Sequence, residues 1–303
     1  MAMISLILCT KNRADLLPEA VRSIEQASAK VTGAVELLIV NNGSTDRTAE
    51  VLERILSETS LSVRCFVEIR PGLCRAKNLA IAHAIGKIIA FTDDDCRLHP
   101  DYFIDLLRHY STDVGPVVRG GRVELGDEND LPFTIKLEDK ASIYAFPVHP
   151  GGFAPGCNLT MAREVIDLIG GFDEEFGPGG PFVAAEDTDL VFRAYKAGIT
   201  VCYVPDMITY HFHGRRAPAD IFSLNRNYQI GNGALHAKHG ITDPILGRHL
   251  YWNLCNYVRE FTGGPIFDKQ LRLSHSAILG PSFLGMVKYA IHRLKSCFTA
   301  TLG

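Results

Sequence analysis

The chain has 303 residues, 47% of them hydrophobic, with 31 lysines and arginines against 34 aspartates and glutamates and a formal net charge of −3. This composition is typical of a globular protein with a sizeable core, and the length suits one large domain with an extension, or two domains. A net charge of −3 gives no excess of basic residues for binding phosphates, so we expect no nucleic-acid partner. No apolar run approaches the roughly 20 residues that a membrane-spanning helix needs.

The cysteines and the first residues of the chain indicate a cytoplasmic protein. Eight cysteines are scattered without a Cys-x-x-Cys pair or the spacing of metal ligands, as is typical of reduced cysteines in the cytosol. The apolar start lacks a basic region and breaks after Cys9, so we expect a strand there rather than a signal peptide. We predict a cytoplasmic location, either free or at the inner face of the membrane.

Strands and helices are predicted to alternate along the first hundred residues. Apolar runs at 4–9, 35–40, 63–69 and 88–92 are expected to form buried strands. Residues with the spacing of amphipathic helices follow the first two strands, and a third helix is expected over 75–85. Strands that are apolar on both faces and alternate with helices predict an α/β fold, with a mostly parallel sheet covered on both sides.

Three consecutive aspartates, Asp93, Asp94 and Asp95, follow the fourth predicted strand. Ligands of open α/β sheets bind at the carboxyl ends of the strands, and three like charges there repel each other unless a cation lies among them. Carboxylate oxygens suit Mg²⁺ or Mn²⁺. Taken alone, the triplet fits a metal site and a solvated turn before the helix near Pro100 equally well.

Five motifs, in their order and spacing, resemble the inverting, metal-dependent glycosyltransferases of family 2, which have the GT-A fold. They are residues 4–13, residues 41–46, residues 76–78 leading to the aspartates at 93–95, residues 170–174, and residues 186–190. The resemblance covers about residues 3 to 215. It departs from the family at Asn41-Asn42, where two aspartates are usual, and at Lys77, where arginine is usual.

The resemblance implies a Rossmann-like GT-A catalytic domain over residues 1–216. Its first half, 1–100, is expected to bind nucleotide and metal, and its second half, 101–216, is expected to bind the acceptor. Residues 217–303 are expected to form a C-terminal helical region.

The activity implied is metal-dependent, inverting transfer of a sugar from a nucleotide-sugar donor to an acceptor hydroxyl, in glycan or glycoconjugate biosynthesis. A UDP-sugar is the favoured donor, with dTDP and GDP left open. The acceptor is a sugar, a lipid-linked molecule or another hydroxyl compound, and the cofactor is Mn²⁺ or Mg²⁺.

The metal site is assigned by the resemblance to the last acid of the triplet. Asp95 is expected to bind the metal, with His211 as a second protein ligand. Alternation along a strand places His211 and His213 on one face, so one is expected to bind the metal and the other a phosphate or the acceptor. An ordinary exposed histidine pair is the alternative.

The catalytic base implied by the resemblance is Asp187, which would take the proton of the acceptor hydroxyl. The helix dipole also stabilises acidic residues in a first helical turn, which explains part of the cluster at 186–189. A single base without a protein nucleophile implies inversion at the anomeric carbon.

The remaining site residues are predicted to hold the two substrates. Acceptor contacts are expected from the glycine-rich segment at 151–160, unless it is a simple turn, and from the first turn of the helix at 186, unless the acid there only caps that helix. The predicted acceptor-binding residues are Gly156, Asn158 and Glu186. The predicted donor-binding residues are Thr10, Asn12, Arg13 and Asn42 around the nucleotide, Lys77 at the diphosphate, and Asp93 and Asp94 near the ribose and the sugar.

Four helices are predicted after Arg216, over 218–239, 243–261, 266–279 and 283–298. The last has an apolar face, with Lys288, Arg293 and Lys295 elsewhere on the helix. Such a helix lies on a membrane surface, or packs against its own domain or a second subunit in a homodimer.

Two other functions fit the same fold. A non-catalytic nucleotide-sugar-binding scaffold would not need Asp95 and Asp187. A sugar nucleotidyltransferase typically carries a glycine-rich phosphate loop after its first strand, and residues 10–13 contain no glycine.

Overall fold

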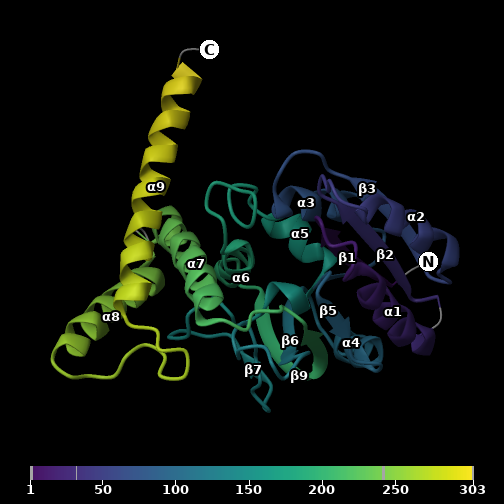
Figure 1. Ribbon diagram of the computed structural model, residues 1–303, viewed down its shortest axis with the longest axis horizontal. Helices are drawn as coiled ribbons and strands as arrows, with labels where there is room; N and C mark the ends of the chain where they lie inside the picture. Colours follow the sequence, from purple (N-terminus) through teal and green to yellow (C-terminus); the bar gives the residue numbers. More distant parts are fainter. Residues whose placement is uncertain (1–2, 32, 241–242, 302–303) are drawn as a thin grey trace.

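The computed structural model describes residues 3–31, 33–240 and 243–301, with side chains up to residue 297. The first four strands form a parallel sheet in the order β3-β2-β1-β4. The strands are β1 (Ile4–Thr10), β2 (Val35–Asn41), β3 (Ser62–Val67) and β4 (Ile88–Asp93), and they alternate with the helices α1 (Leu17–Ser28), α2 (Thr48–Glu58) and α3 (Leu73–His83) (Figure 1).

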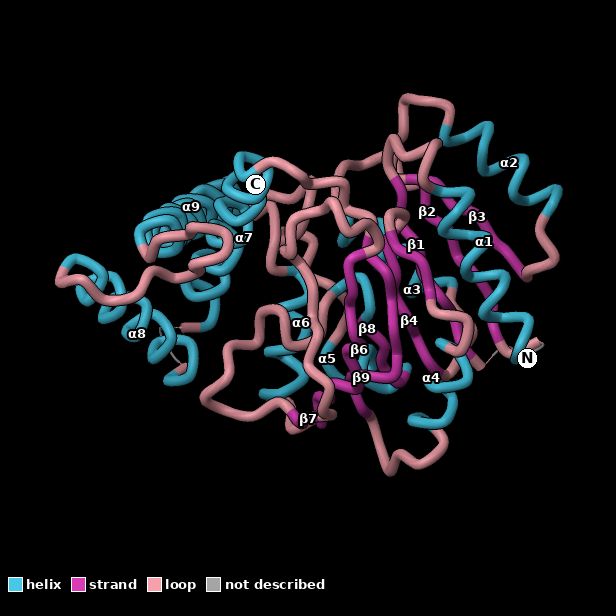
Figure 2. The backbone as a smooth tube through the Cα atoms, turned by 60° about the horizontal axis from the view of Figure 1, so that its bottom comes forward, coloured by secondary structure: helices cyan, strands magenta, loops and turns pink. Residues whose placement is uncertain are grey.

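The sheet continues beyond β4 in the order β8-β6-β9-β5. These strands are β8 (Leu159–Ala162), β6 (Val117–Leu125), β9 (Thr200–His211) and β5 (Cys96–Leu98), and the two-residue β7 (Ser142–Ile143) also pairs with β9 (Figure 2). β6 and β9 are parallel, whereas β8 runs antiparallel to both β4 and β6, and β5 runs antiparallel to β9. The predicted fold, a mostly parallel sheet within an α/β domain, is confirmed.

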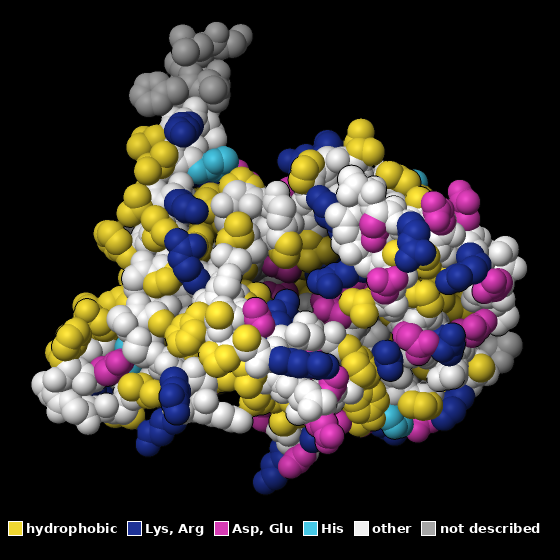
Figure 3. Space-filling model, viewed as in Figure 1, with side chains coloured by type: hydrophobic (Ala, Val, Ile, Leu, Met, Phe, Trp, Pro, Cys, Tyr) yellow, Lys and Arg dark blue, Asp and Glu magenta, His cyan; other side chains and the backbone are white. Residues whose placement is uncertain are grey.

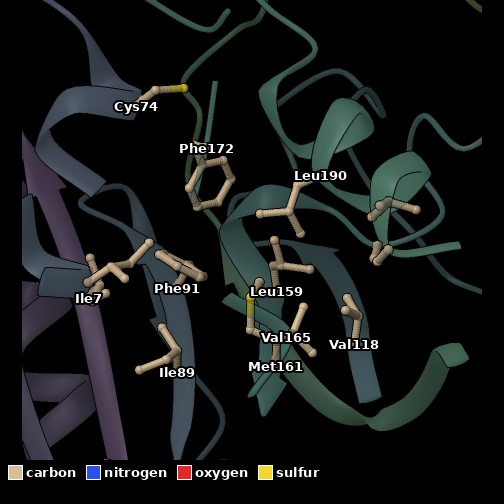
Figure 4. Close-up of a cluster of buried hydrophobic side chains, with 14 of the residues drawn as sticks. Ile7, Cys74, Ile89, Phe91, Val118, Leu159, Met161, Val165, Phe172 and Leu190 are labelled. Carbon is tan, nitrogen blue, oxygen red and sulfur yellow. The ribbon is translucent and has the colours of Figure 1, made fainter. Parts of the chain in front are cut away.

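Helices cover both faces of this sheet. Alternate residues of β1 belong to two different hydrophobic clusters: Ile7 packs toward α3, α5 (Arg163–Ile169) and α6 (Glu186–Lys196), and Leu6 packs toward α1, α2 and α4 (Tyr102–Tyr110). Figure 4 shows the first cluster, where Phe91 of β4 and Phe172 meet edge to face with ring centroids 5.2 Å apart. Burying one such side chain contributes about 1.5–3 kcal/mol, so both faces hold the sheet in place.

Three helices follow the sheet and stand to one side of it (Figure 1). They are α7 (Pro218–His239), α8 (Pro244–Phe261) and α9 (Ser276–Thr301). Glycines let α7 and α9 approach closely, because a Cβ at Gly233 would lie 1.8 Å from the Ser282 carbonyl oxygen. No helix among the described residues is long and apolar enough to cross a membrane.

The predictions for the last two helices were wrong. Residues 262–275 form no α-helix, and α9 runs through Pro281 instead of starting after it. A proline inside a helix cannot donate to the carbonyl four residues earlier, which here belongs to Ala277. The side chain of Asn225 on α7 donates to that carbonyl at 3.2 Å. A neighbouring helix therefore replaces the hydrogen bond that Pro281 removes.

Candidate functional site

A cavity of about 530 Å³ lies between the end of β4 and the C-terminal helices. Figure 3 shows the molecule hollowed between these two parts. Six of the predicted site residues line the cavity: Lys77, Asp93, Gly156, Glu186, Asp187 and His211. The rest of the predicted site lies around the ends of β1, β2 and β4, or behind the cavity wall.

The two predicted metal ligands lie side by side. His211 Nε2 is 3.3 Å from Oδ1 of Asp95, and both side chains are largely buried. The neighbouring residue, Cys96, is the register partner of His211 in the ladder between β5 and β9. Ligand atoms of Asp95, Cys96 and His211 all lie within 4.8 Å of one another. The ladder therefore joins two segments that are far apart in the chain.

The chemistry of this group suits a divalent cation. Burial alone would raise the pKa of Asp95, but the hydrogen bond and the charge of His211 outweigh burial and lower it. Burial also raises the pKa of the Cys96 thiol well above its usual value, which leaves the sulfur protonated and a poor ligand. The carboxylate of Asp95 and the imidazole of His211 remain, a donor pair that can hold a divalent cation once His211, whose pKa is raised by Asp95, has given up its proton.

His213 lies against His211, with ring centroids 5.2 Å apart, but its ring nitrogens have partners within the protein. Its side chain is completely buried, with Nε2 3.1 Å from the Leu131 carbonyl oxygen and Nδ1 accepting from the Arg215 amide. β9 ends at His211, yet the two rings pack together, in agreement with the predicted placement on one face. The predicted contact of the second histidine with a phosphate or the acceptor is not supported, because both ring nitrogens have protein partners.

Asp187 is held in place at the start of α6. Its Oδ2 accepts a hydrogen bond from the Gly156 amide at 3.0 Å, and its Oδ1 accepts from the Thr188 amide at 2.7 Å. The preceding backbone is strained, since Val183 and Ala185 have φ values of 35° and 71°. Such conformations persist only where the surrounding structure enforces them. The carboxylate is therefore fixed against the cavity and not free to rotate.

Lys77 lies in the wall between two acids. It is only 2% exposed, and its Nζ lies 5.0 Å from the ring centroid of Phe172. Burial alone would lower the pKa of Lys77, but Glu186 and Asp93 outweigh burial and raise it. Burial and the neighbouring Asp187 raise the pKa of Glu186 to about 7. A buried, charged ammonium thus faces the cavity beside carboxylates that are hard to ionise.

The polar residues after β1 connect the loops at one end of the sheet. Thr10 donates to Oδ2 of Asp94 at 2.7 Å, and Nε of Arg13 lies 3.9 Å from the other oxygen of Asp94. Asn12, with φ 55°, accepts from the Thr45 amide at 2.7 Å. These four predicted donor-binding residues form one connected edge next to the cavity.

Two of the predicted ligand-contact residues have side-chain amides that are hydrogen-bonded within the protein. The amide of Asn42 donates to the carbonyls of residues 68 and 70 and accepts from the Gly72 amide. Asn158 is completely buried; it donates to the carbonyls of residues 122 and 207 and accepts from Tyr102. Both asparagines hold loops and strands together, and neither presents a free amide to a ligand.

The far wall of the cavity was not predicted. It comes from the loop at 149–152 and from the C-terminal helices, beyond the five motifs. The signal was present in the sequence, because polar residues recur at helical spacing along α7 and so share one face. Cavity-lining residues of this part are His149, Asn225, Tyr228, Gln229, Asn232, His236, His249 and Asn253.

Comparison with known proteins agrees with these motifs. The model of a family described as Glycosyl transferase family 2 matches residues 5–167. The chain belongs to this family. Glycosyltransferase AglE of Haloferax volcanii is 24% identical over 237 residues, which cover 77% of this chain and 73% of AglE. The succinoglycan biosynthesis protein ExoM of Rhizobium meliloti is 23% identical over 208 residues, 66% of this chain and 63% of ExoM.

Solved structures match over nearly the whole chain. The mannosyltransferase PcManGT from Pyrobaculum calidifontis, in complex with GDP-Man and Mn²⁺, has a TM-score of 0.62 at 19% identity and covers 96% of this chain and 87% of its own. TarS 1–349 of S. aureus, in complex with UDP-GlcNAc, has a TM-score of 0.55 at 15% identity and covers 97% and 92%. At these identities the likeness shows the fold, and it confirms the GT-A fold of this family 2 glycosyltransferase.

Proposed function

We propose that the protein transfers a sugar from a nucleotide-sugar donor to an acceptor hydroxyl, with a divalent metal and with inversion. The observation that carries the proposal is that Asp187 lines one cavity together with Asp93, Lys77 and His211. A fixed carboxylate, a buried cation and a metal-ligand pair are what this transfer requires at the acceptor, the donor and the leaving group.

The metal, Mn²⁺ or Mg²⁺, would be held by Asp95 and His211. When bound, such an ion neutralises the diphosphate and orients it. Asp93 and Asp94 stay beside it as the acids nearest the donor's ribose and sugar. Lys77 adds a fixed positive charge at the wall of the cavity, where it can face a phosphate or the sugar as a point charge.

Asp187 would act as the general base. Its Oδ2 takes the proton of the acceptor hydroxyl while that oxygen attacks the anomeric carbon and the bond to the nucleoside diphosphate breaks. One displacement without an enzyme-bound intermediate inverts the configuration. Glu186 lies beside the base, where its raised pKa and its electrostatic attraction to Lys77 suit it to a contact with acceptor or donor rather than to the role of base.

A UDP-sugar remains the favoured donor, with Thr10, Asn12 and Arg13 as the residues nearest the nucleotide. The structural neighbours are compatible with a UDP-sugar or a GDP-sugar, since one is in complex with GDP-Man and the other with UDP-GlcNAc. Asn42, whose amide is hydrogen-bonded within the protein, ranks behind these three residues as a nucleotide contact. The alternative of a non-catalytic scaffold is less favoured, because Asp187 lines the cavity as a candidate base and Asp95 lies beside His211 as a candidate metal ligand.

The test is a panel of UDP-, dTDP- and GDP-sugars. Each is measured for its effect on the melting temperature with Mn²⁺, with Mg²⁺ and with a chelator, since a ligand that binds the native state raises that temperature. Metal-dependent stabilisation by one nucleotide class, followed by turnover of its sugar, supports the proposal. Stabilisation that is unchanged by the chelator contradicts the metal-dependent mechanism.

A further inference from the structure

The cavity continues beyond Asp187 into a pocket that none of the five family motifs reaches. Its walls are the loop at 149–152, α7 and α8, and it is named here the histidine pocket after three of its residues. The rings of His149 and His249 lie 5.0 Å apart, and those of His149 and His236 lie 5.9 Å apart. The three imidazoles therefore form one contiguous wall.

Two of these imidazoles, which belong to residues that line the cavity, have an acceptor atom without a protein partner. His236 is 4% exposed, and its Nδ1 lies 2.6 Å from the Asn232 carbonyl oxygen, so Nδ1 carries the proton. His249 is bonded in the same way to the carbonyl of Val148. The Nε2 atoms of His236 and His249 are buried and have no protein partner. A buried, unpaired polar atom is costly, so each nitrogen calls for a donor supplied by a ligand.

The third imidazole offers a donor. Nδ1 of His149 accepts from the Gly151 amide at 3.0 Å, which places the proton of the neutral ring on Nε2. Burial lowers the pKa of His149 to about 3, and burial also lowers the pKa of His236. All three rings are thus neutral, and the pocket combines two acceptors with one donor.

The charged residues of the cavity all lie at its other end. Lys77, Asp93, Glu186, Asp187 and His211 cluster near β4 and α6, and the remaining described lining residues carry no acid, lysine or arginine. An aromatic pair also lines the cavity, with the rings of Phe133 and Tyr228 stacked 5.9 Å apart. Acceptor lone pairs repel an anion, which is normally held by arginine, lysine or backbone amides.

We propose that the histidine pocket binds the acceptor as an uncharged sugar, whose hydroxyls donate to Nε2 of His236 and of His249. The inference rests on the proposed function and gives its acceptor a chemical class. The sugar ring would lie between the pocket and Asp187, with the hydroxyl to be glycosylated facing the base. Sugars that carry a carboxylate or a phosphate in the pocket are excluded by the same chemistry.

The experiment measures sugar binding to the full chain by calorimetry, in the presence of Mn²⁺ and UDP, with GDP in a second arm. The probes are methyl glycosides of neutral hexoses and N-acetylhexosamines, with methyl glucuronide and glucose 6-phosphate as anionic counterparts. We expect at least one neutral glycoside to bind and both anionic sugars to fail. Equal or tighter binding of an anionic sugar, or binding of none of the glycosides, overturns the proposal.

Variants connect the binding to the two nitrogens. His236→Phe and His249→Phe remove the acceptor atoms, and each should weaken sugar binding about three- to tenfold, the effect of one uncharged hydrogen bond. The matched control is His275→Phe, since Nδ1 of His275 is also buried and unpaired but does not line the cavity. Melting temperatures show whether each variant is folded. If His236→Phe unfolds the protein, His249→Phe carries the test, because His249 is only partly buried.

Donor binding separates the two possible failures. Nucleotide and Mn²⁺ affinity should be unchanged in all three variants, because the histidine pocket lies away from Asp95. A protein that binds no nucleotide with metal contradicts the proposed function. A protein that binds nucleotide with metal, but whose sugar affinity is the same in His236→Phe and His249→Phe as in the wild type, contradicts only the histidine pocket.

A second inference concerns the outer face of α8 and α9, where exposed apolar side chains form one continuous surface, here called the outer apolar surface. Their spacing of three or four residues puts each helix's set on one face. A groove lined by residues of both helices, among them Leu254 and Phe283, joins the two sets. The exposed members are Tyr251, Leu254, Val258 and Phe261 of α8 and Phe283, Val287, Ile291 and Leu294 of α9.

The charge of this region has the opposite sign to the rest of the chain. Residues 217–303 contain nine lysines and arginines against four aspartates and glutamates, whereas residues 1–216 contain 22 against 30. Arg259 and Lys288 are exposed and follow directly after Val258 and Val287, so both flank the apolar faces. In Figure 3, hydrophobic side chains line the outer edge of α9 and basic side chains lie beside them. Apolar area bordered by basic residues is complementary to anionic lipid headgroups.

We infer that the outer apolar surface docks on an anionic membrane surface. Flotation of the full chain with vesicles tests this: we expect binding to phosphatidylcholine mixed with phosphatidylglycerol, weakening with added salt, and little binding to phosphatidylcholine alone. Val287→Ser and Lys288→Glu should each reduce the bound fraction severalfold. Ile69→Ser, which removes an exposed apolar side chain elsewhere, is the control.

Two results overturn this second inference. One is the absence of binding to anionic vesicles. The other is a concentration-dependent dimer in sedimentation that Val287→Ser dissociates while lipid binding is unaffected, because the surface is then covered by a second copy.

Discussion

Cys96 and His211 are register partners in the antiparallel ladder between β5 and β9. Their pairing brings Nε2 of His211 to 3.3 Å from Oδ1 of Asp95. The two proposed metal ligands thus depend on a strand pairing between distant parts of the chain, and each can be tested alone.

Replacement of Asp95 by alanine should abolish metal-dependent nucleotide binding and leave the fold intact. The carboxylate is the hard ligand of the site, and its Oδ1 lies 3.3 Å from Nε2 of His211. Calorimetry with UDP and Mn²⁺ measures the loss. Cys96→Ser is the matched control, because its thiol lies in the same group but is expected to stay protonated. Unchanged Mn²⁺ dependence in Asp95→Ala would remove the metal assignment.

Replacement of His211 by alanine should raise the Mn²⁺ concentration needed for half-maximal activity at least about tenfold. Loss of a residue that only supports a metal ligand already lowers metal affinity by about that factor. Removing one of the two proposed protein ligands lowers the affinity for the ion, while the carboxylate of Asp95 still binds it. A metal titration of turnover measures the change. His99→Ala serves as control, since His99 follows β5 outside the metal-ligand group. A variant with the wild-type titration curve would return His211 to a structural role.

Asp187→Asn should bind donor and metal normally but lose turnover by about two to four orders of magnitude, the contribution of a general base. The asparagine keeps the size of the side chain and one acceptor oxygen, so it can still accept from one of the two amides of Gly156 and Thr188. Steady-state kinetics and a melting curve separate loss of the base from loss of structure. The anomeric configuration of the wild-type product, read by NMR, should be opposite to that of the donor. Retention, or near-normal turnover in Asp187→Asn, contradicts the single displacement.

Asp189→Asn should destabilise the protein by about 3–5 kcal/mol, the cost of breaking a buried ion pair from one side. Asp189 is completely buried and accepts from Arg193 and Lys238 at 2.7 Å each. Denaturant unfolding measures the loss, and Asp173→Asn is the milder control, because Asp173 also pairs with Lys238 but is 23% exposed. A loss no larger than that of Asp173→Asn contradicts the prediction.

The same residue predicts a pH dependence. Burial alone would raise the pKa of Asp189, but the hydrogen bond from His239 and the charges of Lys238 and Arg193 outweigh burial and lower it below the ordinary value of 3.8. A depressed folded-state pKa contributes stability that is present above the unfolded pKa and is lost as the pH falls below it. The difference in unfolding free energy between wild type and Asp189→Asn should therefore shrink below about pH 4.

Gly233→Ala should destabilise the contact between α7 and α9 by about 1–3 kcal/mol, the usual cost of overpacking. The added Cβ would lie 1.8 Å from the Ser282 carbonyl oxygen, so the helices must separate. Gly280→Ala is the control: nothing lies within 4 Å of its Cβ, and alanine is the better helix former by about 1 kcal/mol. Equal melting temperatures for the two variants would contradict the close packing.

Much of the catalytic half could be predicted from the sequence. Runs that are apolar on both faces indicate buried parallel strands, and the ends of such strands share one edge of a sheet. Asp93, Asp94, Asp95 and the polar residues after β1 therefore had to lie near one another. These are consequences of local periodicity and of the rule for parallel sheets, which need no knowledge of distant contacts.

Only the tertiary structure decided the rest. Asn42 and Asn158 have the residue type of ligand-binding groups, but strands and loops distant in the chain saturate their amides. The sequence predicts that the helix stops before Pro281, because proline cannot donate to the carbonyl of Ala277. In the structure, the side chain of Asn225 on another helix donates to that carbonyl. The histidine pocket arises from a loop and two helices that no local pattern brings together. A side chain's type is local, whereas its hydrogen-bond partner is set by long-range packing, and the partner determines whether the side chain is available to a ligand.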